Sequence, residues 1–166
     1  MVMVTPIEHQ GFLIVPADQS SGGALQQLIV SVLNEYGLEP DLAGVDADVL
    51  DLDRHYRQPG GDFFAVYRQA ELVGTMGFAP ISEVACELRK MYLLPAARGH
   101  GLGVRLLQLA EAQVSQRGFR ILQLETASVL KLAVALYERN GYRSVCGSAH
   151  TSRCDRIYRK ELAGNA

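Results

Sequence analysis

The stretch Leu88-Arg89-Lys90-Met91-Tyr92-Leu93-Leu94-Pro95-Ala96-Ala97-Arg98-Gly99-His100-Gly101-Leu102-Gly103 decides the fold. It predicts a strand, a tight glycine-rich turn and the start of a long amphipathic helix. A junction of this kind presents bare backbone N–H groups and a helix N-terminus to an anion. The three glycines allow close approach of that anion, and Arg98 can add a charge-assisted contact. The stretch therefore predicts a site for a phosphate-bearing ligand.

The glycine spacing narrows the kind of phosphate site. The three glycines do not form G-x-G-x-x-G, because Val104 stands where that pattern needs its third glycine. No Gly-Lys-Ser/Thr follows the glycines, which excludes a P-loop. The pattern is instead Arg98-x-x-Gly101-x-Gly103, which resembles the pyrophosphate-binding motif of the GNAT superfamily of acyl-CoA-dependent N-acetyltransferases. An ordinary glycine-rich turn with a helix cap is the alternative. The resemblance implies coenzyme contacts from Met91, Tyr92, Leu93, Arg98, Gly99, His100, Gly101, Leu102 and Gly103.

Hydrophobic periodicity and turn residues divide the rest of the chain into elements. Strands are expected over 11–16, 63–68, 71–80, 84–94, 121–126, 142–148 and 156–161. Helices are expected from position 20 or 21 to 37, and over 48–57, 101–116 and 128–140. This order is the GNAT order. The resemblance therefore implies one α/β (α+β) domain over residues 1–166, with the GNAT fold: a central mixed, mostly antiparallel twisted sheet flanked by helices.

Composition excludes several classes of function. The formal net charge of -2 argues against a general nucleic-acid surface. No apolar run reaches the roughly 18 residues of a membrane span, and the start of the chain has no basic segment of a signal peptide. The three cysteines (Cys86, Cys146 and Cys154) lack zinc-like spacing and are expected as free thiols of a cytoplasmic protein, with Cys86 and Cys146 in the core. The histidines show no metal-ligand clustering, and no metal is expected.

A second signature lies near the C-terminal end. Ala133-Val134-Ala135-Leu136-Tyr137-Glu138-Arg139-Asn140-Gly141-Tyr142 resembles the A-x-x-L-Y-x-x-x-G-F block of GNAT enzymes. The resemblance places Tyr137 beside the coenzyme sulfur, where a phenol can protonate the leaving thiolate. A half-buried core tyrosine is the alternative. Leu130 departs from the family, because many members carry Asn seven residues before this tyrosine; Ser128 and Lys131 are nearby replacements.

The strand before the glycine turn supplies the other candidates. Period-two alternation predicts that Glu87, Arg89, Met91 and Leu93 share one face. Measured from Arg98, Glu87 falls where a histone-acetylating branch of the family carries its general base. Glu87 is therefore a candidate base or amine ligand, with a structural ion pair to Arg89 as the alternative. Arg89 suits recognition of a substrate carboxylate, so the two residues together would match an α-amino acid or a peptide terminus.

Three further expectations concern the surroundings of these candidates. Family geometry places a bulge in the same strand, which would turn N–H groups of residues 91–93 toward the acyl carbonyl. Glu125, at the end of the next strand, is a second candidate for base or amine contact, with a surface ion pair as the alternative. The segment 46–57 is expected to shape the acceptor pocket, and the side chain of His100 is expected to point to solvent.

Together these features predict an N-acetyltransferase that uses acetyl-CoA as co-substrate. The expected reaction is direct attack of a primary amine on the thioester within a ternary complex. The expected acceptor is a small amine or an amino acid, with a protein or peptide amine as the runner-up. A homodimer stays open. The rival readings are a non-catalytic acyl-CoA-binding sensor and a dinucleotide-binding domain, which the glycine register disfavours.

Overall fold

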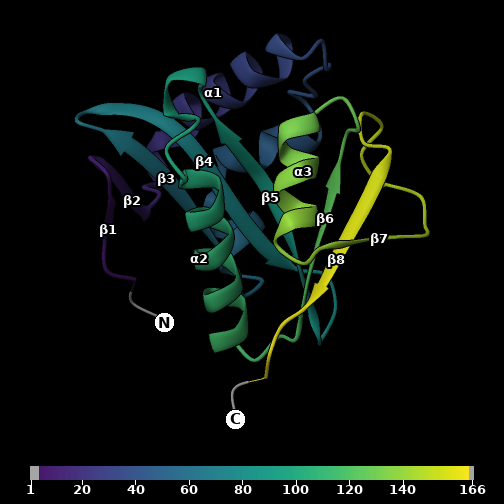
Figure 1. Cartoon of the computed structure of the whole chain (residues 1–166). Helices are drawn as coiled ribbons and strands as arrows, with labels where there is room; N and C mark the ends of the chain where they lie inside the picture. Colours follow the sequence, from purple (N-terminus) through teal and green to yellow (C-terminus); the bar gives the residue numbers. More distant parts are fainter. Residues whose placement is uncertain (1–3, 165–166) are drawn as a thin grey trace.

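The structure, a computed structural model, describes residues 4–164. One open sheet of eight strands runs through it in the order β1-β2-β3-β4-β5-β6-β8-β7 (Figure 1). Every neighbouring pair is antiparallel except β5 and β6, which are parallel. This confirms the expected mixed, mostly antiparallel sheet. The strands are β1 Ile7–His9, β2 Phe12–Pro16, β3 Asp62–Arg68, β4 Glu71–Pro80, β5 Ala85–Leu93, β6 Ile121–Thr126, β7 Arg143–Val145 and β8 Arg156–Glu161.

Three helices cover the sheet, and two cores form against its two faces. On one face, α2 (Leu102–Gln116) and α3 (Lys131–Arg139) lie side by side (Figure 1) and enclose a core with Phe64, Leu106 and Leu122. On the other face, α1 (Gly22–Glu35) packs on the neighbouring residues of β3. Because β3 is buried on both faces, residues 62–66 form a continuous buried run rather than an alternating one.

Four short helical turns complete the architecture: Gln19–Ser21, Val45–Leu50, Asp53–Arg57 and Pro95–Ala97. Two of them occupy the region where one helix over 48–57 was expected. Tyr56, in the turn Asp53–Arg57, is fully buried. Its ring packs edge-on against Phe63 of β3, with ring centroids 4.9 Å apart. The turns are therefore held by packing on the α1 face, although they are too short to be stable helices alone.

The structure differs from expectation at three places. No strand was expected before residue 11, yet β1 pairs with β2 at the edge of the sheet. The last helix begins at Lys131 rather than at Ser128, because the Ser128 backbone N–H and hydroxyl both donate to the carboxylate of Asp155, at 2.8 and 2.6 Å. Cys146 is exposed, so only Cys86 joins the core.

A β-bulge at Lys90 changes the alternation of β5. Gly77 pairs with Arg89 and Thr75 with Tyr92, so two residues of β5 oppose one of β4. Lys90 has the left-handed φ of +54°, and its carbonyl accepts a 2.6 Å hydrogen bond from the Thr75 hydroxyl. An inserted residue moves every later side chain to the opposite face. The expected bulge is therefore present in the strand.

The bulge overturns the expected shared face of β5. Met91 and Leu93 pack into the core on the α2 face, as Leu88 does before the bulge. Glu87 and Arg89 lie on the opposite face, toward α1, where Tyr92 also packs against the core. The strand thus offers charged side chains to one face and apolar ones to the other.

The parallel pair β5 and β6 separates halfway along its length. Pairing runs from Ala85 and Ile121 to Leu88 and Leu124 and ends there, although β5 continues to Leu93. The backbone edge of β5 that faces β6 therefore has no partner strand beyond Leu88. This divergence produces an opening in the middle of the sheet.

Candidate active site

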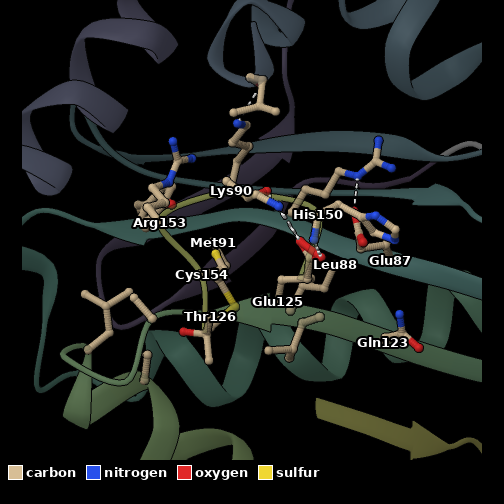
Figure 2. Close-up of a pocket in the computed structure, with 18 of the residues that line it drawn as sticks. Glu87, Leu88, Lys90, Met91, Gln123, Glu125, Thr126, His150, Arg153 and Cys154 are labelled. Atoms are coloured by element: carbon tan, nitrogen blue, oxygen red, sulfur yellow. Dashed lines mark hydrogen bonds and ion pairs between the residues drawn. The ribbon is translucent and has the colours of Figure 1, made fainter. Parts of the chain in front are cut away.

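A cavity of about 620 Å³ lies where β5 and β6 diverge. Five parts of the chain form most of its lining: β5, β6, α3, the segment 38–48 and the segment 150–154 that precedes β8. In Figure 2 Glu87 lies at one end of the cavity and Arg153 at the other, with Met91 and Cys154 between them in this view. Its polar lining includes Asp48, Glu87, Arg89, Lys90, Glu125, Tyr137 and Arg153.

Glu87 and Arg89 form an ion pair on the cavity wall. Arg89 donates from Nε to Glu87 Oε1 at 2.6 Å, and the two side chains are 32% and 15% exposed. This pair was the structural alternative for Glu87. Among the described residues, Arg89 uses only Nε in this pair, and its two terminal nitrogens form no hydrogen bond. Recognition of a substrate carboxylate by Arg89 stays a prediction.

Tyr137 reaches the same cavity from α3. Its ring is buried and packs edge-on against Tyr142, with centroids 5.9 Å apart. Burial raises the pKa of the Tyr137 hydroxyl above its ordinary value, and the nearby Tyr92 and Cys154 act in the same direction. The hydroxyl therefore holds its proton at neutral pH and can donate a hydrogen bond. Among the described residues, no side chain forms a hydrogen bond with it.

Glu125 has a structural task at the cavity edge. Its carboxylate accepts hydrogen bonds from the backbone N–H groups of His150 and Thr151, the second at 3.3 Å, and from the Thr151 hydroxyl at 3.3 Å. Figure 2 shows Glu125 directly beside His150. The residue therefore holds the β7–β8 loop against β6. Its candidacy as a base stays a prediction, since it would have to act while bound to this loop.

A buried group of three charges ties the two loops to the bulge. Asp46 is fully buried and accepts from Lys90 Nζ at 2.6 Å and from both terminal nitrogens of Arg153 at 2.7 and 2.8 Å. Lys90 also donates to the Val45 carbonyl at 2.8 Å. Burial opposes the charge of Asp46, but the hydrogen bonds from Arg153 and Lys90 lower its pKa to about 2. The loop with Asp46, the bulge and the β7–β8 loop are thus one connected unit.

The glycine turn lies at the start of α2. Gly99 and Gly101 adopt φ values of +79° and +76°, which favour glycine. Among residues 4–164 no side chain caps α2, so the N–H groups of its first turn are left for another partner. Leu102 is buried in the core, so only its backbone could meet a ligand. Binding of a phosphate at this turn stays a prediction.

Gly103 has a packing role, and its expected contact with the coenzyme stays a prediction. A Cβ at this position would lie 2.8 Å from Leu136 Cδ2. The missing side chain therefore lets α2 approach α3 closely. At Gly101 a Cβ would meet only the ring of His9, at 3.4 Å.

Two side chains of the turn lie differently from expectation. Arg98 binds both carboxylate oxygens of Glu35, at 2.7 and 2.8 Å, and donates from Nε to the Leu93 carbonyl at 3.1 Å. A contact from Arg98 to an anion stays a prediction, and it requires the guanidinium to share or leave Glu35. The expectation that His100 points to solvent is wrong, because its ring is partly buried against Phe12, with ring centroids 5.1 Å apart.

Sequence reasoning missed Asp46, Lys90, Arg153 and Cys154 as parts of one site. They come from three distant segments and follow no periodic pattern. The many charged residues of the segment 46–57 were the one feature in the sequence that pointed toward Asp46. Burial raises the pKa of the Cys154 thiol to about 11, so this cavity cysteine is not a ready nucleophile.

Comparison with known proteins identifies the family. The model of the acetyltransferase (GNAT) family matches residues 29–142. The chain belongs to this family. It is therefore an N-acetyltransferase, an acyltransferase enzyme. The protein is 40% identical over 127 residues to the uncharacterized N-acetyltransferase YjgM of Escherichia coli, an alignment that covers 74% of this chain and 76% of YjgM.

Solved GNAT structures share the fold. A GNAT acetyltransferase of Staphylococcus aureus superimposes with a TM-score of 0.85 at 22% identity, over 92% of this chain and 99% of that one. The yncA protein of Salmonella typhimurium, whose structure contains acetyl-CoA, superimposes with a TM-score of 0.74 at 16% identity, over 95% and 97% of the two chains. These likenesses confirm the GNAT fold expected from the two sequence signatures.

The described residues contain neither a metal-ion site nor a membrane-spanning helix. Between residues 4 and 164, no group of three or more His, Cys, Asp or Glu side chains could hold a metal ion. Within the same residues, no helix has both the length and the apolar character needed to cross a membrane.

Proposed function

We propose that this enzyme transfers the acetyl group of acetyl-CoA to a primary amine of a small molecule bound in the cavity. The observation that carries the proposal is the common position of Tyr137, Glu87 and the bulged part of β5 around one opening between β5 and β6. The pyrophosphate would lie on the turn around Gly101, and the pantetheine arm would follow the unpaired edge of β5. The amine would enter from the side of Glu87.

Three groups have distinct tasks in the proposed reaction. Glu87 takes the proton that the ammonium form of the acceptor must lose before its nitrogen can attack, directly or through a water. Backbone N–H groups of β5 beyond Lys90 stabilise the negative charge that develops on the acyl oxygen. Tyr137 gives its proton to the departing sulfur. Burial raises the pKa of this phenol, so its hydroxyl is protonated over the whole neutral range and can donate a hydrogen bond to the sulfur as negative charge develops there.

The ion pair that joins two segments beside the cavity supports a small acceptor. The loop that carries Asp46 and the loop that carries Arg153 both line the cavity or adjoin it, and the bidentate ion pair between them joins the two. A polypeptide acceptor would need an open groove between these loops for the chain that follows its amine. The free terminal nitrogens of Arg89 further favour an acceptor with a carboxylate, such as an amino acid.

The test is a screen of amines with detection of the released thiol. The panel contains amino acids, the matching decarboxylated amines, polyamines and short peptides with free N-termini. The proposal expects turnover with at least one small amine and none with the peptides. Turnover with peptides alone would replace the small acceptor by a protein amine. Tight binding of acetyl-CoA without turnover on any acceptor would favour a sensor.

A further inference from the structure

The N-terminal hairpin contacts the glycine turn through one side chain. His9, the last residue of β1, places its Nε2 2.7 Å from the carbonyl oxygen of His100, 91 residues away in the chain. A carbonyl only accepts, so Nε2 carries the hydrogen and donates it. The same nitrogen lies 3.4 Å from the position that a Cβ on Gly101 would take. The imidazole thus rests directly against the turn.

This hydrogen bond fixes the direction of one peptide group. In a trans peptide the C=O and the following N–H point to opposite sides. A carbonyl of His100 that is held toward His9 therefore turns the N–H of Gly101 away from the hairpin. The peptide joins His100 to Gly101, and Gly101 and the nearby Gly99 both have positive φ, where glycine permits other backbone conformations at small cost. Without a partner for the carbonyl, this peptide would be free to rotate.

The hairpin itself is built to hold the imidazole in place. Gln10 and Gly11 both have positive φ, +48° and +84°, as in the tight two-residue turns that join antiparallel strands. His9 pairs with Phe12, which is buried and packs against the ring of His100. The hairpin end and the turn therefore contact each other through both a hydrogen bond and a ring contact.

We infer that His9 is a positioning residue for the coenzyme: it orients the 100–101 peptide so that the Gly101 N–H is available to a phosphate of acetyl-CoA. The inference rests on the proposed function, because it assumes that the coenzyme phosphates lie on this turn. His9 acts through the backbone and needs no contact with the coenzyme. Both the neutral imidazole with hydrogen on Nε2 and the protonated imidazole keep the donor, so the effect does not depend on which form is present.

The first measurement is calorimetric titration with acetyl-CoA of the parent and three variants. His9→Ala removes the donor and is expected to raise the dissociation constant roughly two- to tenfold, the effect of one lost hydrogen bond. His9→Gln keeps an N–H donor at similar reach and is expected to restore most of the affinity. Glu8→Ala changes the preceding, exposed residue of the same strand and serves as the control without effect.

The second measurement reads the peptide directly. Amide resonances are followed by nuclear magnetic resonance during titration with inorganic pyrophosphate. The Gly101 amide is expected to shift strongly in the parent and in His9→Gln, and weakly in His9→Ala. This readout distinguishes a positioned peptide from a general loss of stability, which would affect resonances across the whole sheet.

The outcomes separate the inference from the function beneath it. If the parent does not bind acetyl-CoA, the proposed function fails and the inference fails with it. If the parent binds but His9→Ala binds equally well, with an unchanged Gly101 response, only the inference is overturned. Equal weakening in His9→Ala and His9→Gln would also overturn it, since packing of the ring rather than its donor would then matter.

Discussion

Lys90 and Asp46 lie 44 residues apart in the chain, yet Lys90 Nζ is 2.6 Å from Asp46 Oδ1 in a buried position. Lys90 is also the bulge residue of β5. The residue that changes the side-chain alternation of β5 is therefore anchored by its own side chain to the turn Val45–Leu50. Asp46 extends the connection to Arg153 on the β7–β8 loop.

Removing the charge of Asp46 should be strongly destabilising. Asp46→Asn would leave the buried Arg153 without its carboxylate and Lys90 with only Asp48, 3.8 Å away, and removing one partner of a buried pair costs about 3–5 kcal/mol. Urea unfolding measures the loss. Glu83→Gln, which changes an exposed carboxylate, is the control and should stay within about 0.5 kcal/mol of the parent. A similar stability for Asp46→Asn and the control would show that the three charges are not a stabilising unit.

The same carboxylate predicts an acid-dependent loss of stability. The pKa of Asp46 is about 2 in the folded protein, below the value of about 3.9 for an unperturbed aspartate. Its contribution is therefore complete above about pH 4 and is lost as the pH falls through 2. The difference in unfolding free energy between the parent and Asp46→Asn should shrink over this range. A difference that stays constant down to pH 2 would contradict the assignment.

The pair of Arg98 and Glu35 changes what is expected of the glycine turn. Because Glu35 already neutralises the guanidinium, Arg98→Ala should alter the dissociation constant of acetyl-CoA by a factor of about three or less, as for a weak surface pair. Glu35→Gln should free Arg98 and strengthen binding. Arg98→Ala in the Glu35→Gln background should then be clearly more harmful. Calorimetric titration of the four proteins completes the cycle, and identical effects of Arg98→Ala in both backgrounds would refute the competition.

Arg89 should determine the preference for acceptors with a carboxylate. Free amino acids should exceed the matching decarboxylated amines in kcat/KM, and Arg89→Ala should remove this difference because the terminal guanidinium nitrogens are lost. Arg139→Ala, an exposed change at the end of α3, is the matched control. If the parent enzyme does not discriminate within an acid and amine pair, Arg89 serves only to hold Glu87.

The order of strands and helices was largely predictable from the sequence. The prediction for the site was wrong at β5, and the bulge residue Lys90 explains why. Alternation in β5 predicted a shared face for Glu87, Arg89, Met91 and Leu93. That prediction assumed a regular strand, whereas the bulge at Lys90 inserts one residue. Family resemblance had indicated a bulge but not its position. A lysine at φ +54° depends on the Thr75 hydroxyl and on Asp46, and such tertiary contacts leave no local pattern.

The most direct test of the account is the turnover of Tyr137→Phe. The ring and its packing on Tyr142 are kept, and no hydrogen bond of the hydroxyl to a described side chain is lost, so the fold and the affinity for acetyl-CoA should be preserved. With an acceptor from the amine screen, kcat and kcat/KM should fall together by roughly 10²–10⁴-fold, as expected for a positioned acid. Full turnover of Tyr137→Phe at saturating concentrations of both substrates would contradict the role of this residue and the arrangement of the site around it.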